Sequence, residues 1–144
     1  MAVTAFNHFP EIARALHREL KKTVKEVADS IADDAAIHAP EDTGFLAASI
    51  YVKTQTTSTY GKGHVSMTPY QALHRELFPE VDAPPDDLTA YIAVGATYGI
   101  YLEMGTRYMP AQPYFYPAME AGNAYFETLV SFIEGNITAE VGML

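Results

Sequence analysis

A helical stripe in the first third of the chain is the feature that most constrains its fold. From Ile12 the apolar residues recur at steps of four and three as far as Ala35, while charged residues fill the other positions. This spacing places the apolar side chains on one side of an α-helix. Pro40 disfavours helical geometry in the residue before it, so the helix is expected to end near Ala39. We therefore predict a long amphipathic helix.

The start of this helix is predicted from capping residues. Asn7 can cap the first turn through its side-chain oxygen. Pro10 then falls within that turn, where its missing N–H costs little. Residues 1–6 are accordingly expected to form a loose arm.

The middle of the chain predicts strands. The segment 45–54 leads into one predicted strand, in which residues alternate from Ile50 onward, and the segments 64–68 and 88–94 predict two more. The segment 69–88 is rich in proline and acidic residues and predicts a flexible insert, because long connections inside a domain are uncommon and often mobile. A short helical segment is expected over 98–104.

A second apolar stripe predicts a C-terminal helix that begins near Pro113–Pro117. Gly122 weakens it locally and is expected to mark close packing, while Gly135 is a second candidate for its end. Together the segments predict a single α+β domain over residues 1–144. In this domain a small antiparallel sheet packs with the long N-terminal helix and the C-terminal helix.

Composition excludes several functional classes. The chain has 9 Lys plus Arg against 18 Asp plus Glu, and its net charge of -9 argues against tight binding to a nucleic-acid backbone. It contains no cysteine, which excludes disulfides, thiolate metal sites and cysteine nucleophiles. No apolar run approaches the length of a membrane span, and the N-terminus lacks the pattern of a secretory signal.

The segment from Tyr98 to Pro117 holds five of the ten tyrosines of the chain. Glycine and proline restrict its backbone, and aromatic residues and arginine dominate the energetics of protein–protein contacts. No nucleophile with a neighbouring base is present in it. We therefore predict an assembly surface rather than an active site. The candidate contact residues are Tyr98, Tyr101, Glu103, Arg107, Tyr108 and Tyr114.

Glu103 and Arg107 are four residues apart and are expected to pair across the turn between them. The pair is either a weak exposed ion pair or a contact that fixes this turn, within a chain or between subunits. Other residues are predicted to shape turns through positive φ, side-chain hydrogen bonds or the proline ring. These structural turn residues are Asp42, Thr43, Gly44, Gly105, Thr106, Pro110 and Pro113.

Asp42-Thr43-Gly44 is also the signature tripeptide of aspartic proteases. A retroviral-type enzyme has one copy per chain and buries the two aspartates side by side in a dimer, each after an apolar strand. Here a long helix and Pro40 precede the tripeptide, so a helix-to-strand turn is favoured. The five histidines show no metal-ligand spacing. We expect no catalytic residue, no cofactor and no metal.

Three motifs follow one another along the chain. The first contains Ala39, Pro40, Asp42, Thr43, Gly44, Leu46, Ser49 and Ile50. The second contains Tyr98, Tyr101, Glu103, Gly105 and Thr106, and the third Pro110, Ala111, Gln112, Pro113, Tyr114, Pro117 and Ala118. In this order they resemble the head–tail joining proteins of long-tailed phages, the neck or tail-completion group typified by gene product ten of a lambda-like coliphage. The chain departs from that pattern at Phe45 and in the long acidic insert.

The resemblance implies a non-enzymatic structural subunit of the virion, assembled in the host cytoplasm. Such a subunit forms a homo-oligomeric ring in the neck, between portal-side head-completion proteins and tail terminator or tail-tube proteins. An acidic lumen lets the genome DNA pass without specific binding, and no membrane is involved. The alternatives are a tail-tube terminator and, in a different class, a dimeric aspartic protease.

Overall fold

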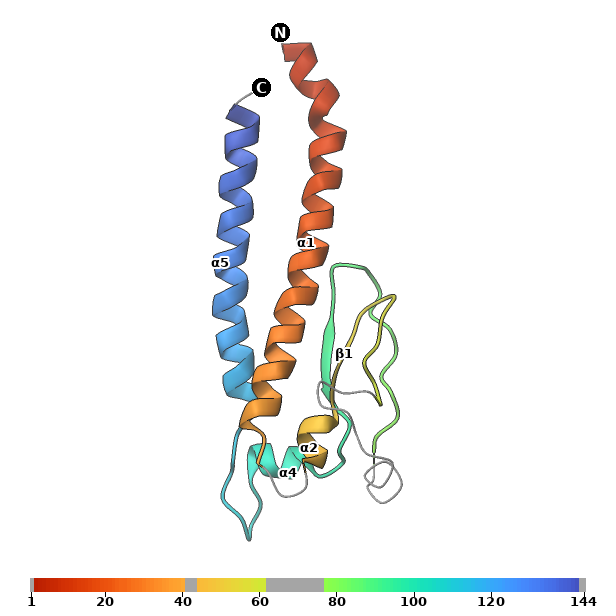
Figure 1. Cartoon of the computed structure of the whole chain (residues 1–144), viewed down its shortest axis with the longest axis vertical. Helices are drawn as coiled ribbons and strands as arrows, with labels where there is room; N and C mark the ends of the chain where they lie inside the picture. The colour runs from red at the N-terminus through yellow and green to blue at the C-terminus, as the bar shows by residue number, and fades with distance from the viewer. Residues whose placement is uncertain (1, 41–43, 62–76, 143–144) are drawn as a thin grey trace.

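Two long helices that run in opposite directions are the main elements of the fold (Figure 1). The computed structural model describes residues 2–40, 44–61 and 77–142. In chain order its elements are α1 (Ala2–His38), α2 (Phe45–Ala48), β1 (Ile50–Lys53), β2 (Tyr91–Val94), α4 (Gly99–Met104) and α5 (Phe115–Gly142). Strands β1 and β2 pair antiparallel, with Ile50 opposite Val94. The fold is therefore α+β, as the sequence predicts.

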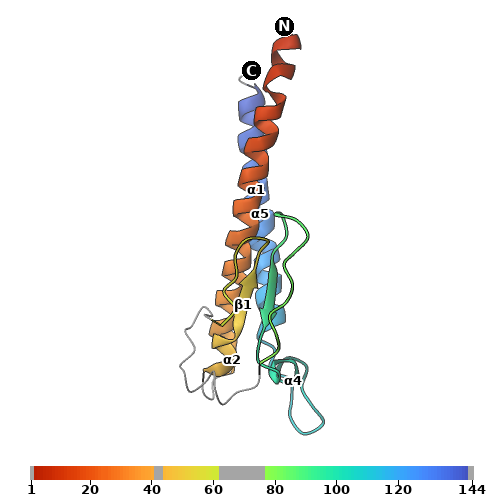
Figure 2. The same cartoon turned by 90° about the vertical axis from the view of Figure 1, so that its right-hand side faces the viewer.

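The sheet and the short helices cover only one half of the helix pair. Figures 1 and 2 show α1 between α5 and the sheet, with α2 and α4 at the end far from the chain termini. The other half of α1 and α5 projects beyond the sheet. No helix in the described ranges combines the length and apolar character needed to cross a membrane.

The core lies where the C-terminal half of α1 meets α2, the sheet and the start of α5. Alanines on α1, including Ala32 and Ala35, are fully buried and let the neighbouring elements approach closely. Phe45 and Leu46 of α2 and Ile50 of β1 fill the remaining space. Burying such apolar side chains is the main force that holds these elements together.

Helices α1 and α5 pack closely against each other at Gly122. A Cβ atom built there would lie 2.1 Å from Cγ1 of Ile31, well inside van der Waals contact. The expectation of close packing at Gly122 is thus confirmed. Gly135 instead faces open space, and α5 continues through it to Gly142, so the alternative end at Gly135 is wrong.

Helix α1 begins earlier than its capping signal suggests. It starts at Ala2 rather than after Asn7, and Pro10 lies inside it, so the prediction of a loose arm over residues 1–6 is wrong for residues 2–6. No glycine or proline interrupts residues 2–6, and a cap residue at Asn7 does not prevent earlier turns from forming.

The segment that leads into the first predicted strand contains a helical turn. Residues 45–48 form the helical turn α2, and Ile50–Lys53, where the predicted alternation begins, pair as β1. Phe45, Leu46 and Ala48 are all buried, which an alternating half-exposed strand would not achieve. Ser49 closes the turn, because its hydroxyl donates to the Leu46 carbonyl at 2.7 Å.

The third predicted strand is shorter than expected, since only Tyr91–Val94 pair with β1. The predicted strand at 64–68 lies outside the described residues, as does most of the predicted insert. The described part of the insert is bonded to the rest of the chain at several points, for example through Phe78, whose N–H donates to the Gly95 carbonyl at 2.8 Å. Glu80 accepts a hydrogen bond from Lys53 at 2.9 Å, and Asp87 lies 2.8 Å from His17 of α1.

Candidate subunit interface

The connector between α4 and α5 folds back against α4. Gly105 ends α4 with a φ of 76°, and its N–H donates to the Tyr101 carbonyl at 2.8 Å. A Cβ at this position would lie 2.7 Å from the Ala111 nitrogen, so only glycine fits. The N–H of Gln112 then donates to the Leu102 carbonyl at 2.7 Å. Gly105 therefore shapes this turn, as predicted.

A tight hairpin forms the tip of the connector. The N–H of Thr106 donates to the Met109 carbonyl at 2.8 Å, which leaves Arg107 and Tyr108 at the turn. Tyr108 is 90% exposed, and the Arg107 guanidinium lies 5.8 Å from the centre of its ring. At this distance the cation and the ring attract each other. The most exposed aromatic side chain of the described residues is thus held at the end of a closed turn.

Glu103 ties the base of this hairpin to α5. Its Oε2 accepts hydrogen bonds from the backbone N–H groups of Tyr114 at 2.8 Å and Phe115 at 3.0 Å. Its Oε1 accepts one from the N–H of Tyr116 at 2.9 Å. These donors belong to the first turn of α5, which otherwise has no partners for them. No ion pair joins Glu103 to Arg107 in the described chain, so the expected pairing across the turn does not form.

The electrostatics of Glu103 follow from these contacts. Burial alone would raise the pKa of its carboxyl group. The hydrogen bonds from the three backbone N–H groups outweigh burial and hold the pKa below its ordinary value. The positive end of the α5 dipole favours the same charged state. Glu103 is therefore an ionised cap inside the chain.

Tyr114 is also used inside the chain. Only 1% of it is exposed, and its hydroxyl donates to the Gly99 carbonyl at 3.1 Å. Burial, together with the negative charge of Glu103, raises the pKa of this hydroxyl well above its ordinary value. Tyr98 packs against the core, with its ring 6.0 Å from that of Phe45. These internal roles argue against Tyr98, Glu103 and Tyr114 as residues that touch another subunit.

Replacing Tyr114 with phenylalanine is expected to lower the free energy of unfolding by about 1–2 kcal/mol, because the buried Gly99 carbonyl loses its donor. Urea unfolding followed by circular dichroism measures this change. Tyr116→Phe is the control, since Tyr116 is 64% exposed and its change is expected to have little effect. Equal losses in both variants would contradict the assigned role of Tyr114.

An exposed apolar patch remains around α4 and the connector tip. Of the predicted contact residues, Tyr101, Arg107 and Tyr108 lie in it. The sequence reasoning missed three further members, which are 59–72% exposed: Ile100, Met104 and Tyr116. Helix α4 is too short for its apolar periodicity to show which side is exposed. The sequence therefore did not distinguish Ile100 and Met104 from core residues. We call these six residues the connector patch.

The predicted turn residues are distributed over two loops. Gly44 has a φ of 73°, the left-handed geometry predicted for it. Asp42 and Thr43 lie outside the described residues. Thr106 pairs with Met109 in the connector hairpin, and Pro110 and Pro113 are exposed on the segment that returns along α4. No cluster of three histidine or acidic residues in the described ranges could hold a metal ion.

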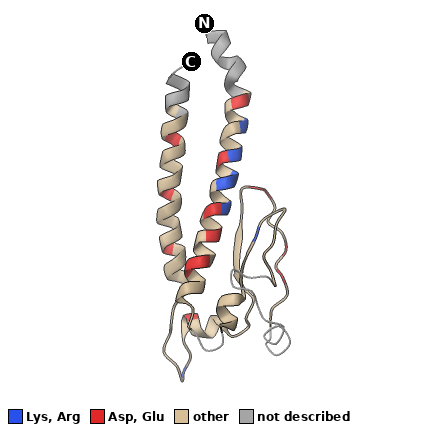
Figure 3. Cartoon of the chain, viewed as in Figure 1, with Lys and Arg blue, Asp and Glu red and all other residues tan. Residues whose placement is uncertain are grey.

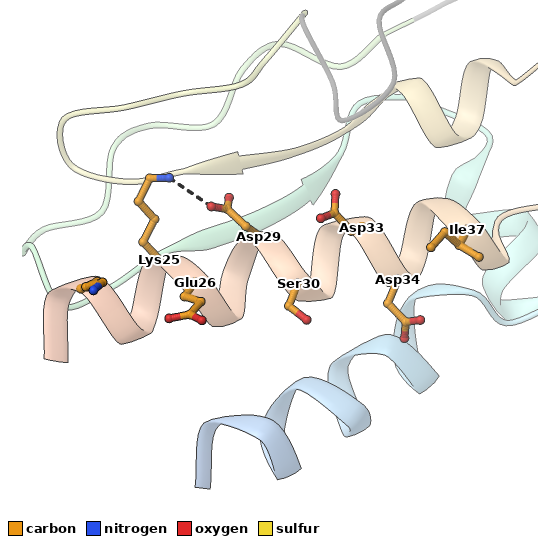
Figure 4. Close-up of a pocket in the computed structure, with 8 residues that line it drawn as sticks. Lys25, Glu26, Asp29, Ser30, Asp33, Asp34 and Ile37 are labelled. Atoms are coloured by element: carbon orange, nitrogen blue, oxygen red, sulfur yellow. Dashed lines mark hydrogen bonds and ion pairs between the residues drawn. The ribbon is translucent and has the colours of Figure 1, made fainter. Parts of the chain in front are cut away.

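A shallow hollow on the exposed side of α1 is the other feature of the surface (Figure 4). Its lining includes Glu26, Asp29, Asp33 and Asp34. In Figure 4 Lys25 reaches Asp29, at 3.0 Å, while Asp34 points to the side of α5. The hollow is acidic but contains no arrangement of a base with a nucleophile. Comparison of the chain with protein-family models, curated proteins and solved structures found no match.

Proposed function

We propose that the chain is a structural subunit of the head-to-tail connector of a tailed phage. Several copies form a ring in the neck of the virion, between portal-side head-completion proteins and the tail, and the ring leaves a channel for the genome. The proposal rests on the three ordered motifs of the sequence and on the connector patch. It assigns no catalytic role to the chain.

The observation that carries this proposal is the rigid presentation of the connector patch. The three backbone hydrogen bonds to Glu103 and the closed turn of Gly105 fix its base. Exposed aromatic, methionine and arginine side chains on an ordered support are typical of protein interfaces. They lose little conformational freedom on binding because their backbone is already ordered. This favours an assembly role over catalysis.

The charge of the chain supports a place beside DNA without specific binding to it. The net charge is -9, and described acidic side chains lie along both long helices (Figure 3). A surface of this sign repels phosphate groups, so DNA in the channel would slide rather than adhere. The motifs and the connector patch, rather than this charge, carry the choice of a neck subunit.

Mass spectrometry of purified particles and a reconstruction of the intact virion test the proposal directly. The expected result is a ring of this protein between the portal and the tail. If the protein is absent from particles whose assembly requires its gene, the proposal is wrong. A position at the end of the tail tube, away from the neck, would instead favour the terminator alternative.

The double substitution Arg107→Ala and Tyr108→Ala is expected to reduce incorporation into particles at least about tenfold, because interface aromatics and arginines often contribute 2 kcal/mol or more. The thermal stability of the isolated chain should not change, since Tyr108 is 90% exposed. Phe132→Ala is the matched control, because Phe132 is 66% exposed but lies on α5, on the side opposite to Glu127 and Glu134 and away from the connector. Normal incorporation of the double variant would remove the connector patch from the interface.

A further inference from the structure

Helix α1 carries a concentrated basic stripe in an otherwise acidic chain. Five of the nine Lys and Arg residues fall between positions 14 and 25 (Figure 3). Arg14, Arg18, Lys21 and Lys25 follow one another at steps of four, three and four, which places them on one side of the helix. Lys21 and Lys25 border the loops of the sheet. The stripe therefore lies beside the loops of the sheet, and Arg18 also borders the groove that α1 shares with α5.

Helix α5 carries the opposite charge. It contains no Lys or Arg, and Glu120, Glu127 and Glu134 recur at steps of seven. This spacing places all three on nearly the same side of α5, and all three are exposed. Their side differs from the apolar side of α5, where Gly122 meets α1. The two charged stripes thus occupy different faces of the molecule.

Most of these charges find no opposite charge within the chain. The described ion pairs use Lys21, Lys25 and Lys53, together with two histidines. None involves Arg14, Arg18 or the three glutamates of α5 among the residues that the structure describes. Two cations of the stripe, Arg14 and Arg18, and the acidic row of α5 are therefore open to a partner.

The two rows also lie at the same height along the helix pair. Gly122 contacts Ile31, and the Tyr125 hydroxyl donates to Glu26 at 3.0 Å, while Ile133 and Asn136 share a groove with residues 12–22. Glu127 and Glu134 are consequently level with the basic stripe. Glu120 is level with the part of α1 that the sheet covers. Copies related by rotation about an axis parallel to the helices keep the same positions along that axis, so the acidic row of one copy is level with the basic stripe of the next.

We propose that α5 of one copy packs against the basic stripe of the next copy, with Glu127 and Glu134 opposite Arg14, Arg18 and Lys21. This contact deepens the proposed function, on which it rests, because it names the faces that join neighbouring subunits of the ring. The faces differ, so the contact is heterologous, the type that closes into a ring by rotation. The loops of the sheet border Arg18 and Lys21, and beyond these loops no other described element of the sheet runs along α1 (Figure 1).

A second copy fits this stripe better than nucleic acid does. The complementary acidic row is present in every copy, at the matching height and with a similar length along the helix. DNA would meet the basic stripe beside a protein surface whose total charge is -9. Charge complementarity also sets the orientation of neighbouring subunits. Like charges would meet if the basic stripe of one copy faced the basic stripe of the next, or if the two acidic rows faced each other.

Charge reversal of the full-length chain tests the contact. Arg14→Glu with Arg18→Glu, and separately Glu127→Lys with Glu134→Lys, should each raise the dissociation constant of the oligomer at least about tenfold, because like charges then face each other. Light scattering after gel filtration, at low and at high ionic strength, measures this change. Glu120→Lys is the matched control and should leave the mass of the oligomer unchanged. Circular dichroism verifies the fold of each variant.

Rescue separates this contact from a general loss of folding. The chain that carries all four reversals has exchanged the charges of these four positions and should recover most of the association of the unchanged protein. Mixing the two double variants should also restore association, because each then offers the charge that the other needs. Failure of both rescues, with folded variants, would overturn the proposal.

Three other results would also overturn it. One is an oligomer of unchanged mass in both double variants, which would show that the subunits of the ring join through other faces. Another is a monomeric unchanged protein at low ionic strength. The third is a gel shift of double-stranded DNA that Arg14→Glu with Arg18→Glu abolishes while the oligomer persists. Failure of the proposed function itself has a separate readout, namely absence of the protein from particles.

Discussion

Replacing Glu103 with alanine is expected to lower the free energy of unfolding by about 3 kcal/mol. The change removes three hydrogen bonds from backbone N–H groups to a charged acceptor and leaves the first turn of α5 without its cap. A single cap contributes about 1 kcal/mol, and hydrogen bonds to charged groups contribute more. Urea unfolding at neutral pH measures the loss. Glu120→Ala, an exposed site on the same helix, should cost much less.

The same cap predicts how stability depends on pH. The pKa of Glu103 is lower in the folded chain than its ordinary value of 4.5. A depressed pKa contributes stability that is present above the unfolded value and is lost as the pH falls through the folded value. We therefore expect the stability difference between the unchanged protein and Glu103→Gln to shrink on acidification below about pH 4.5. A difference that stays constant from neutral to acidic pH would contradict the cap.

Replacing Gly122 with leucine is expected to lower the free energy of unfolding by about 3 kcal/mol or to prevent folding. The first added atom alone would lie 2.1 Å from Cγ1 and 2.4 Å from Cδ1 of Ile31, which is itself buried. Overfilling a packed interior typically costs about 1–3 kcal/mol, and here α1 and α5 must separate. Thermal unfolding measures the shift in melting temperature.

Two comparisons isolate the packing effect at Gly122. Gly135→Leu introduces the same side chain into the same helix, but nothing lies within 4 Å of that site. It should leave stability unchanged or raise it by up to about 1 kcal/mol, because leucine favours helix more than glycine does. Combining Gly122→Ala with Ile31→Ala should cost less than the sum of the single changes, since only Cβ of Ile31 then remains, at 3.6 Å. Additive costs would show that the two sites do not touch.

The long elements of this fold could be predicted from the sequence because each repeats its apolar pattern over many turns. The stripe from Ile12 is a property of consecutive residues and needs no knowledge of the rest of the chain. The four residues Phe45–Ala48 are different, since so short an apolar run fits a strand and a buried helical turn equally well. Its burial against α1 decided between them, and that contact is not visible in the sequence.

The sequence predicted a surface in this segment, but it did not predict which of the residues are exposed and which contact the interior. Aromatic density indicated a surface, and Tyr101, Arg107 and Tyr108 are exposed as such a surface requires. Glu103 and Tyr114 belong to the same segment but serve the interior, because the connector folds back and brings α4 to the start of α5. Spacing along the chain suggested a partner for Glu103 four residues away, whereas its real partners lie 11 to 13 residues away.

The antiparallel course of α1 and α5 has a consequence for any ring of copies. The N-terminus of α1 and the C-terminus of α5 lie at the same end of the molecule, while the connector tip occupies the opposite end (Figure 1). Copies related by rotation about an axis parallel to these helices would therefore build a collar with two unlike rims. One rim would display aromatic hairpins and the other only helix ends. Such a collar has two different ends, and in the proposed neck ring it would present a different surface to the head than to the tail.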